Sequence, residues 1–539
     1  MNWSLPFPSG RQPVLARNVV STSQPLAAQA GLAAMARGGN AIDAALAAAI
    51  TLTVVEPTMN GIGGDAFALV WDGSQLHGLN ACGRAPQAWS PERFAGMEHM
   101  PKVGWDSVTT PGGVAAWKAL SERFGALPFE DLFTDAIRHA RDGFPVSPVI
   151  ARQWAQAAID LGAQPGFTEF LKPDGSAPQT GEIWRFPAQA DTLQEIARTR
   201  TESFYRGALA QRMAAFSQTC GAALTADDLA AHQVEWVEPI STPFGDRTVH
   251  EIPPNGQGIA ALIALGILEQ LPYRDTAPGS AARMHLEIEA MRLAFADLYA
   301  HIADPAHMEV TAAQLLAPAY LQRRAALIDP QRAGSYPPGQ PSSGGTVYLC
   351  AADAQGRMVS FIQSNFKGFG SGVVVPGTGI ALHNRGMGFV TTPGHPNQVA
   401  GGKRPMHSII PAFMLRNAAT VVKTQVYSGI PSQLQEIADK AFIPLARGAS
   451  LALDGARCYK TWTNPNSSWM DRSMDTLHVA TDIAGLAGAV APMVFPPLAP
   501  YADTLLAAGF AGDIVSYSYR GLQYFNRRSL GEAPPPPPQ

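Results

Sequence analysis

Two short apolar runs separated by a polar turn form the clearest hydrophobic pattern in the chain. Val347–Ala352 and Met358–Gln363 are rich in residues that strands favour, and Asp353-Ala354-Gln355-Gly356 between them is typical of a turn. The pattern therefore predicts an antiparallel hairpin. The segment before it, 328–345, is rich in Gly, Pro and Ser, and we expect an exposed linker there.

Most of the chain before this linker alternates helical periodicity with Gly and Pro breaks. Residues 25–52 predict two alanine-rich helices around Gly38-Gly39-Asn40. A short strand, Ala66–Trp71, should follow the turn formed by Gly61–Asp65. The pattern predicts further helical segments in 112–124, 129–143, 150–235, 259–271 and 284–301.

Two of these segments contain polar residues that can be interpreted locally. Thr225 precedes Ala226-Asp227-Asp228, a sequence that predicts a helix start capped by the threonine side chain. His285 and Glu289 lie one helical turn apart, but the second histidine of a zinc-protease motif is missing. We therefore interpret them as surface groups of an amphipathic helix.

Composition and charge exclude several classes of function. Of the 539 residues, 46 % are hydrophobic and 15 % charged, which predicts a large folded core. The net charge of -4 gives no reason to expect nucleic acid as a partner. No apolar run has the length of a membrane span and the first residues lack a signal-peptide pattern, so we expect a cytoplasmic protein without membrane contact. The cysteines lack metal-binding or disulfide spacing: Cys82, Cys220, Cys350 and Cys458.

Thr346 is the main candidate for chemistry. It stands between Gly344-Gly345 and the first strand of the predicted hairpin. A threonine hydroxyl needs a base to act as a nucleophile, and its own α-amine can serve if the chain is cut before it. Taken alone, a threonine at a strand start also fits simple β-propensity. The wider sequence has to decide between these interpretations.

Several short blocks follow one another in a fixed order between residues 15 and 416. They are Gln29–Ala45, Gly61–Asp65, Thr110–Gly113, Asp228–His232, Pro253–Gly258, Glu289–Asp297 and Gly402–Pro405. In this order and spacing the chain resembles the γ-glutamyltransferase (glutathione hydrolase) family of N-terminal-nucleophile hydrolases. That family cuts itself before the threonine of a Thr-x-x-x-x-Val-Val-Asp-x-x-Gly frame. Thr346 to Gly356 fit the frame, with Ala351-Ala352 replacing the valines.

The resemblance implies an α+β fold, a four-layer αββα sandwich of the N-terminal-nucleophile hydrolase type. It also implies that the Thr346 hydroxyl attacks the Gly345 carbonyl, giving large and small chains from one proenzyme. The freed α-amine would then act as base while the hydroxyl takes an acyl group from a small γ-glutamyl or glutaryl amide. The acyl group would pass to water or an amino-acid acceptor. No cofactor and no metal are implied.

The substrate site implied by the resemblance departs from the family pattern. Family members hold the substrate's α-carboxylate with an arginine and its α-amine with an acidic residue. Here Cys82 fills the best-aligned arginine position, Arg84 lies two residues later, and Gly388 replaces the acidic residue. These losses favour an acyl group without an α-amino-acid head, as in glutaryl-type cephalosporin acylases. The candidate substrate-binding residues are Arg84, Ser364, Asn365, Asn384, His407 and Ser408.

The chain no longer matches the family after Asn417. We divide it into a large-subunit region, 1–345, the start of a small-subunit region, 346–417, and a divergent region, 418–539, with a proline-rich tail. The family's small chain carries a Gly-Gly pair that stabilises the oxyanion, and 403–539 contains no such pair. An inactive, unprocessed relic is therefore an alternative to γ-glutamyl transfer and to glutaryl-type acylase activity.

Overall fold

A six-stranded antiparallel sheet forms the centre of the computed structural model, which describes residues 14–334, 336 and 345–416. In spatial order its strands are β1 (Val19–Thr22), β9 (Gly345–Ala352), β10 (Met358–Phe366), β2 (Asp65–Trp71), β3 (Leu76–Asn80) and β6 (Glu235–Val237). The predicted hairpin is confirmed as β9 and β10, and the predicted strand after Gly61–Asp65 is confirmed as β2.

The two predicted alanine-rich helices are confirmed as α1 (Pro25–Ala36) and α2 (Ala41–Val55). Asn40 caps α2, because its side chain accepts from the Ile42 amide at 2.8 Å while Asp43 accepts from the Asn40 amide at 2.8 Å. Every residue of α2 is buried, and the helix packs against β9 and β10. Asp353 in the hairpin turn accepts from the Ala41 amide at 3.1 Å, which ties the turn to the start of α2.

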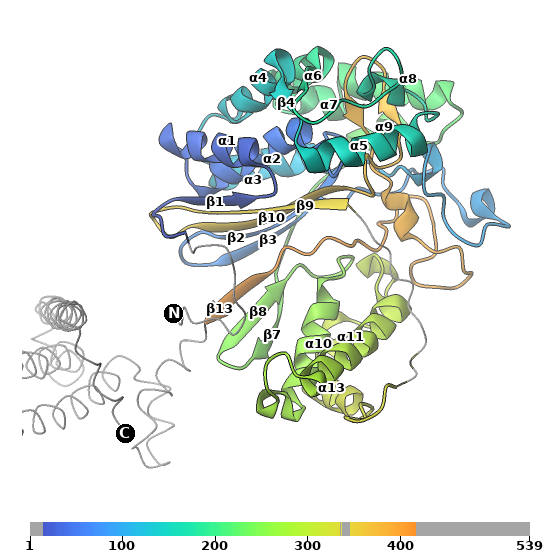
Figure 1. Cartoon of the computed structure of the whole chain (residues 1–539). Helices are drawn as coiled ribbons and strands as arrows, with labels where there is room; N and C mark the ends of the chain where they lie inside the picture. Colours follow the sequence, from blue (N-terminus) through green and yellow to red (C-terminus); the bar gives the residue numbers. More distant parts are fainter. Residues whose placement is uncertain (1–13, 335, 337–344, 417–539) are drawn as a thin grey trace, which may run out of the picture. The chain divides into compact units, whose positions relative to one another are not determined.

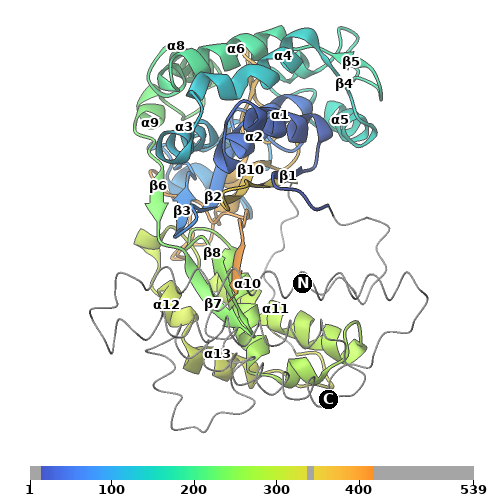
Figure 2. The same cartoon turned by 90° about the vertical axis from the view of Figure 1, so that its left-hand side faces the viewer.

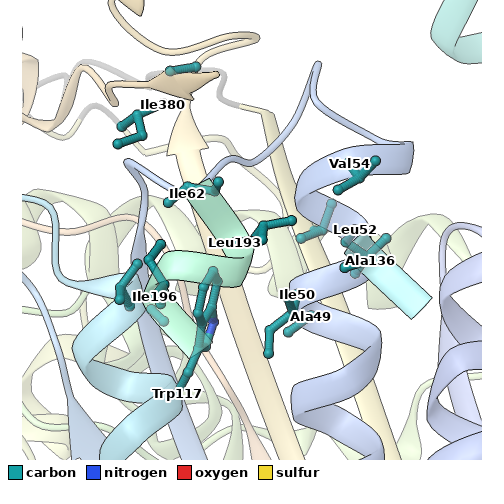
Figure 3. Close-up of a cluster of buried hydrophobic side chains, with 14 of the residues drawn as sticks. Ala49, Ile50, Leu52, Val54, Ile62, Trp117, Ala136, Leu193, Ile196 and Ile380 are labelled. Atoms are coloured by element: carbon teal, nitrogen blue, oxygen red, sulfur yellow. The ribbon is translucent and has the colours of Figure 1, made fainter. Parts of the chain in front are cut away.

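Further helices lie on the same face of the sheet as α1 and α2 (Figure 1). Residues such as Trp117, Leu193 and Ile196 meet Ile50 of α2 in the largest apolar core (Figure 3). Thr225 caps α9 as predicted, accepting from the Asp228 amide at 3.1 Å. These helices are α3 (Gly113–Phe124), α4 (Thr134–Asp142), α5 (Pro148–Leu161), α6 (Pro187–Arg198), α7 (Glu202–Tyr205), α8 (Ala208–Thr219) and α9 (Ala226–Ala230).

A second, three-stranded sheet lies on the opposite side of the large sheet, with helices beyond it (Figures 1 and 2). Its strands are β13 (Phe413–Arg416), β8 (Arg247–Glu251) and β7 (Ile240–Phe244). The helices are α10 (Gly258–Glu269), α11 (Ala281–His301), α12 (Ala312–Leu315) and α13 (Pro318–Ala325). Short two-stranded pairs complete the strands: β4 (Phe144–Pro145) with β5 (Ile183–Trp184), and β11 (Val374–Val375) with β12 (Ile380–Ala381). The fold thus combines helices and sheets, as expected.

The interpretation of Glu289 on α11 as a surface group is wrong. Glu289 is 1 % exposed and accepts hydrogen bonds from the Gly334 amide at 2.8 Å and from Arg292 at 2.9 Å. The segment around Gly334 covers this helix face, and a local pattern cannot show a cover supplied by distant sequence.

Within the described residues, no helix is both long and apolar enough to cross a membrane. The divergent region 418–539 and half of the expected linker, 335 and 337–344, lie outside the described residues.

Candidate active site

The ladder between β9 and β10 is irregular where the sequence predicts cleavage. Val347 pairs with Gln363 and Gly345 pairs with Phe366, so Ser364 and Asn365 lie opposite the single residue Thr346. Such a β-bulge bends a strand and redirects its side chains. The bulge therefore places two predicted substrate-binding residues beside the predicted cleavage site.

The glycine turn before β2 packs directly against this bulge. A Cβ atom on Gly61 would lie 2.9 Å from the Asn365 side-chain nitrogen, and one on Gly64 would lie 2.9 Å from the Ser364 carbonyl oxygen. The turn closes through a 3.0 Å hydrogen bond from the Gly64 amide to the Gly61 carbonyl. Glycine is thus required here for close approach to the bulge, which confirms the tight-turn interpretation.

Asp65, the first residue of β2, is the centre of a buried polar cluster. Its carboxylate accepts from the Gly112 amide at 2.9 Å and lies 3.3 Å from His407 Nε2 and 3.9 Å from His383 Nε2. Burial raises the pKa of Asp65 to about 7, although the charge of Arg385 opposes that rise. Burial also lowers the pKa of His383 to about 3 and that of His407 well below its ordinary value, so both rings are neutral at pH 7.

Arg385 is the buried cation of this cluster. It begins the short 3₁₀ helix η7 (Arg385–Gly388) and is 1 % exposed. One nitrogen, Nη1, donates to the Ser408 hydroxyl at 2.8 Å, and the guanidinium carbon lies 4.6 Å from the centre of the Phe366 ring. Burial lowers the pKa of Arg385 to about 10, which still leaves it charged at neutral pH.

The two predicted asparagines have different surroundings. Asn384 holds loops together, since its side chain donates to the Lys102 carbonyl at 2.8 Å and accepts from the Lys367 amide at 3.1 Å. Asn365 is fully buried, and its side-chain oxygen and nitrogen have no hydrogen-bond partner among the described residues. Because an unpaired buried amide is costly, Asn365 is the better candidate for a group that meets substrate.

Two cavities lie close to the predicted residues. One, of about 500 Å³, is lined by Arg84, Arg404, Thr110 and His232 among others. Arg84 is already engaged there, 3.0 Å from Asp304 and 3.6 Å from Glu235. The other, of about 470 Å³, is bordered by Lys367–Gly370 and Asn384. This second cavity therefore lies beside the glycine-rich stretch Gly368–Gly372.

The described residues contain one group whose spacing could admit a metal ion. Ligand atoms of Asp65, Cys82 and His407 lie within 4.8 Å of one another. Two features oppose a cation there: the positive charge of Arg385, and the burial of Cys82, which raises the pKa of its thiol and so disfavours the thiolate that would bind a metal ion. The expectation of a metal-free site stays a prediction.

Comparison with known proteins decides the family. A family model described as Gamma-glutamyltranspeptidase matches residues 27–429. This chain belongs to the gamma-glutamyltranspeptidase family. The family resemblance stated from the sequence is therefore confirmed, and the family and its relatives indicate an amide hydrolase or acyltransferase.

Several relatives of this gamma-glutamyltranspeptidase family member carry proenzyme names. An oxamate amidohydrolase proenzyme from Klebsiella pneumoniae is 39 % identical over 407 residues, covering 74 % of this chain and 76 % of the relative. A glutathione hydrolase-like proenzyme from Bacillus subtilis is 34 % identical, covering 74 % and 76 %. A solved cephalosporin acylase from Bacillus halodurans has a TM-score of 0.72 and 46 % identity, covering 77 % of this chain and 78 % of that one.

Sequence reasoning missed three residues of the buried cluster. Asp65 ends the predicted turn Gly61–Asp65 and His383 precedes the predicted substrate-binding residue Asn384, but no role was predicted for either. Arg385 was likewise passed over. They lie close together because β2 pairs with β10 and because the later segment at His383 runs back to the glycine turn, where the His383 amide donates to the Gly63 carbonyl. A signal in the sequence was the concentration of His, Asn and Arg in a segment otherwise rich in glycine.

Proposed function

We propose that the chain is a self-cleaving proenzyme that hydrolyses or transfers the acyl group of a small amide through an ester on Thr346. The observation that carries this proposal is the bulge of Ser364 and Asn365 opposite Thr346. A bulge beside the predicted cleavage point gives the site the irregular backbone that active sites often use. The six-stranded sheet, the three-stranded sheet and their outer helices also support the four-layer αββα arrangement.

Cleavage would begin when the Thr346 hydroxyl attacks the Gly345 carbonyl carbon. The peptide bond between the two residues breaks, an ester forms, and the threonine nitrogen becomes a free α-amine. Water then hydrolyses the ester, leaving a carboxylate on Gly345 and a free hydroxyl on Thr346. Nucleophile and base thereby belong to one residue at the start of β9, which fixes their relative geometry.

In turnover the same hydroxyl would attack the substrate amide carbonyl, and its proton would pass through the α-amine to the departing amine. The Asn365 side-chain nitrogen, unpartnered in the described structure, is available to stabilise the oxyanion of the tetrahedral intermediate. The threonine ester then transfers its acyl group to water or to an amine acceptor.

The site favours an acylase-type substrate over a γ-glutamyl one. A γ-glutamyl head carries an α-amine, and Gly388 offers no side chain to pair with it; a Cβ atom there would lie 2.5 Å from the Met406 carbonyl oxygen. Arg84 is held by Asp304 and Glu235, which limits its use for an α-carboxylate. The names of the oxamate amidohydrolase and cephalosporin acylase relatives support the same preference.

Intact mass spectrometry of three purified proteins tests the proposal. The natural chain should appear as two polypeptides, the second beginning with Thr346-Val347-Tyr348, whereas Thr346→Ala should remain one polypeptide. Thr22→Ala is the matched control, because Thr22 lies in β1 beside β9 and should leave cleavage unchanged. A natural chain that stays whole, or a Thr346→Ala chain that is still cut at this bond, would overturn the proposal.

A further inference from the structure

The guanidinium group of Arg385 is buried with more donors than partners. Its Nη1 donates to Ser408, but Nε and Nη2 have no hydrogen-bond partner within the described part of the chain. A guanidinium group with unsatisfied N–H donors is costly to bury. A bound ligand that accepts from these donors would remove that cost.

The two unpartnered nitrogens suit one kind of ligand. Nε and Nη2 lie on the same edge of the planar guanidinium group, and their N–H bonds point outward in parallel. This edge matches the two oxygens of a carboxylate, which can accept both hydrogen bonds at once. A lone carbonyl or hydroxyl would satisfy only part of it.

The unpartnered edge belongs to the neighbourhood of the predicted cleavage site. The Arg385 guanidinium carbon lies 4.6 Å from the centre of the Phe366 ring, and the backbone of Phe366 pairs with Gly345. The preceding residue, Asn365, and His383 in the same cluster also carry buried side-chain atoms without a hydrogen-bond partner in the described structure. A ligand at Arg385 would therefore lie near the residues that flank Thr346.

The surrounding charges leave room for an anion. Asp65 is the nearby carboxylate whose charge acts on Arg385, but its oxygens are taken up by the Gly83 and Gly112 amides and by His407. Since its pKa is about 7, Asp65 is only partly ionised at neutral pH. The pKa values of His383 and His407 are depressed, so neither ring adds charge. The cluster is consequently short of negative charge when no ligand is bound.

We propose that Arg385 binds a carboxylate on the acyl half of the substrate, and that the substrates are monoamides of short dicarboxylic acids. This inference rests on the proposed function, because it takes Thr346 as the nucleophile. It assigns the specificity-determining contact to a residue outside the arginine position of the family pattern, which Cys82 fills and near which Arg84 is engaged in ion pairs.

Turnover of matched substrates provides the test. Glutaryl and succinyl p-nitroanilides carry the terminal carboxylate, and valeryl and butyryl p-nitroanilides are their neutral counterparts. We expect Arg385→Gln to lower kcat/KM for the better carboxylate substrate about 100-fold while changing that for its neutral counterpart less than about 3-fold. Arg385→Lys keeps the positive charge but loses the two parallel N–H donors, so its kcat/KM for the carboxylate substrate should lie between those of the natural protein and Arg385→Gln.

A remote arginine controls for loss of structure. Arg324 lies on α13 and pairs with Asp297 at 2.8 Å, away from the β9–β10 bulge, so Arg324→Gln should leave the carboxylate preference unchanged. An equal loss on charged and neutral substrates in Arg385→Gln, with cleavage at Thr346 intact, would overturn the proposal. So would a natural protein that turns over neutral anilides as well as the charged ones.

A binding measurement separates this inference from the proposed function. Calorimetric titration of the full chain with succinate and glutarate should show binding that Arg385→Gln weakens about 100-fold, with valerate as the monocarboxylate comparison. Binding that depends on Arg385 in a protein without turnover would support the carboxylate site and refute the threonine-ester function. Turnover without a preference for carboxylate substrates would refute the carboxylate site but not the threonine-ester function. A protein that shows neither carboxylate binding nor carboxylate preference would also refute the carboxylate site.

Discussion

Asp65→Asn offers a quantitative check on the buried cluster. The variant keeps the shape of the side chain but removes the group whose pKa burial raises from 3.8 to about 7. We would make it in a Thr346→Ala background, in which the chain is expected to stay in one piece, so that unfolding involves a single polypeptide.

The sign and size of the effect follow from proton linkage. The folded protein binds the Asp65 proton more tightly than the unfolded chain, so the stability that this group contributes is complete below pH 3.8 and is lost as the pH rises through about 7. At 1.36 kcal/mol per pKa unit, a shift of about 3 units corresponds to a total of about 4 kcal/mol. Between pH 4.5 and 7.5 the loss amounts to about 3 kcal/mol.

Urea unfolding at pH 4.5, 5.5, 6.5 and 7.5 measures this loss. The free energy of unfolding of the Asp65→Asn variant minus that of its parent should increase by about 3 kcal/mol over this range. Buried histidines such as His383 have depressed pKa values and therefore add stability as the pH rises, but both proteins contain them and the subtraction removes their effect.

Asp72→Asn is the matched control. Asp72 directly follows β2, but a hydrogen bond from His77 and others from backbone amides lower its pKa, so it is largely ionised in both the folded and the unfolded state above pH 4.5. Its difference curve should stay level. A level or falling curve for Asp65→Asn would show that Asp65 is fully ionised in the folded protein. In that case Arg385 already has its anion, and the argument for a carboxylate ligand fails.

Three further substitutions test individual contacts. Asp43→Ala should lower the free energy of unfolding by about 3 kcal/mol in urea titrations, since its carboxylate accepts from the Asn40, Ala126 and Leu127 amides; a loss below about 1 kcal/mol would contradict this role. Gly63→Ala should lower stability by about 2 kcal/mol and slow self-cleavage on gels, because its Cβ atom would overlap the Ala381 carbonyl oxygen. Asn365→Ala should reduce kcat about 10²–10³-fold with little change in KM in steady-state assays; an unchanged kcat would exclude it as oxyanion donor.

Local signals predicted much of the fold. The hairpin from Val347 to Gln363 could be predicted from two apolar runs and a turn, and the break between α1 and α2 from Gly38-Gly39-Asn40, because each depends on neighbouring residues. The bulge opposite Thr346 could not be predicted, since it depends on the register between two strands. The burial of Glu289 was missed for the same kind of reason, a cover supplied by another part of the chain.

The site was predicted in part. Ser364 and Asn365 do lie beside Thr346, and His407 and Ser408 join the buried cluster through Asp65 and Arg385. The role proposed for Arg385 could not be predicted from the sequence, because its unpartnered donors depend on residues that only the fold brings around it. The assignments of Thr346 and of the substrate-binding residues stay predictions that the experiments above address.

The central claim is that the hydroxyl of Thr346 carries the acyl group. The most direct measurement is rapid quenching with acid during turnover of a glutaryl anilide, followed by mass spectrometry of the peptide that begins at Thr346. We predict that this peptide gains the mass of one glutaryl group minus the displaced proton, and that the adduct disappears as substrate is consumed. An acyl group found on a different residue, or no fragment beginning at Thr346, would contradict the account.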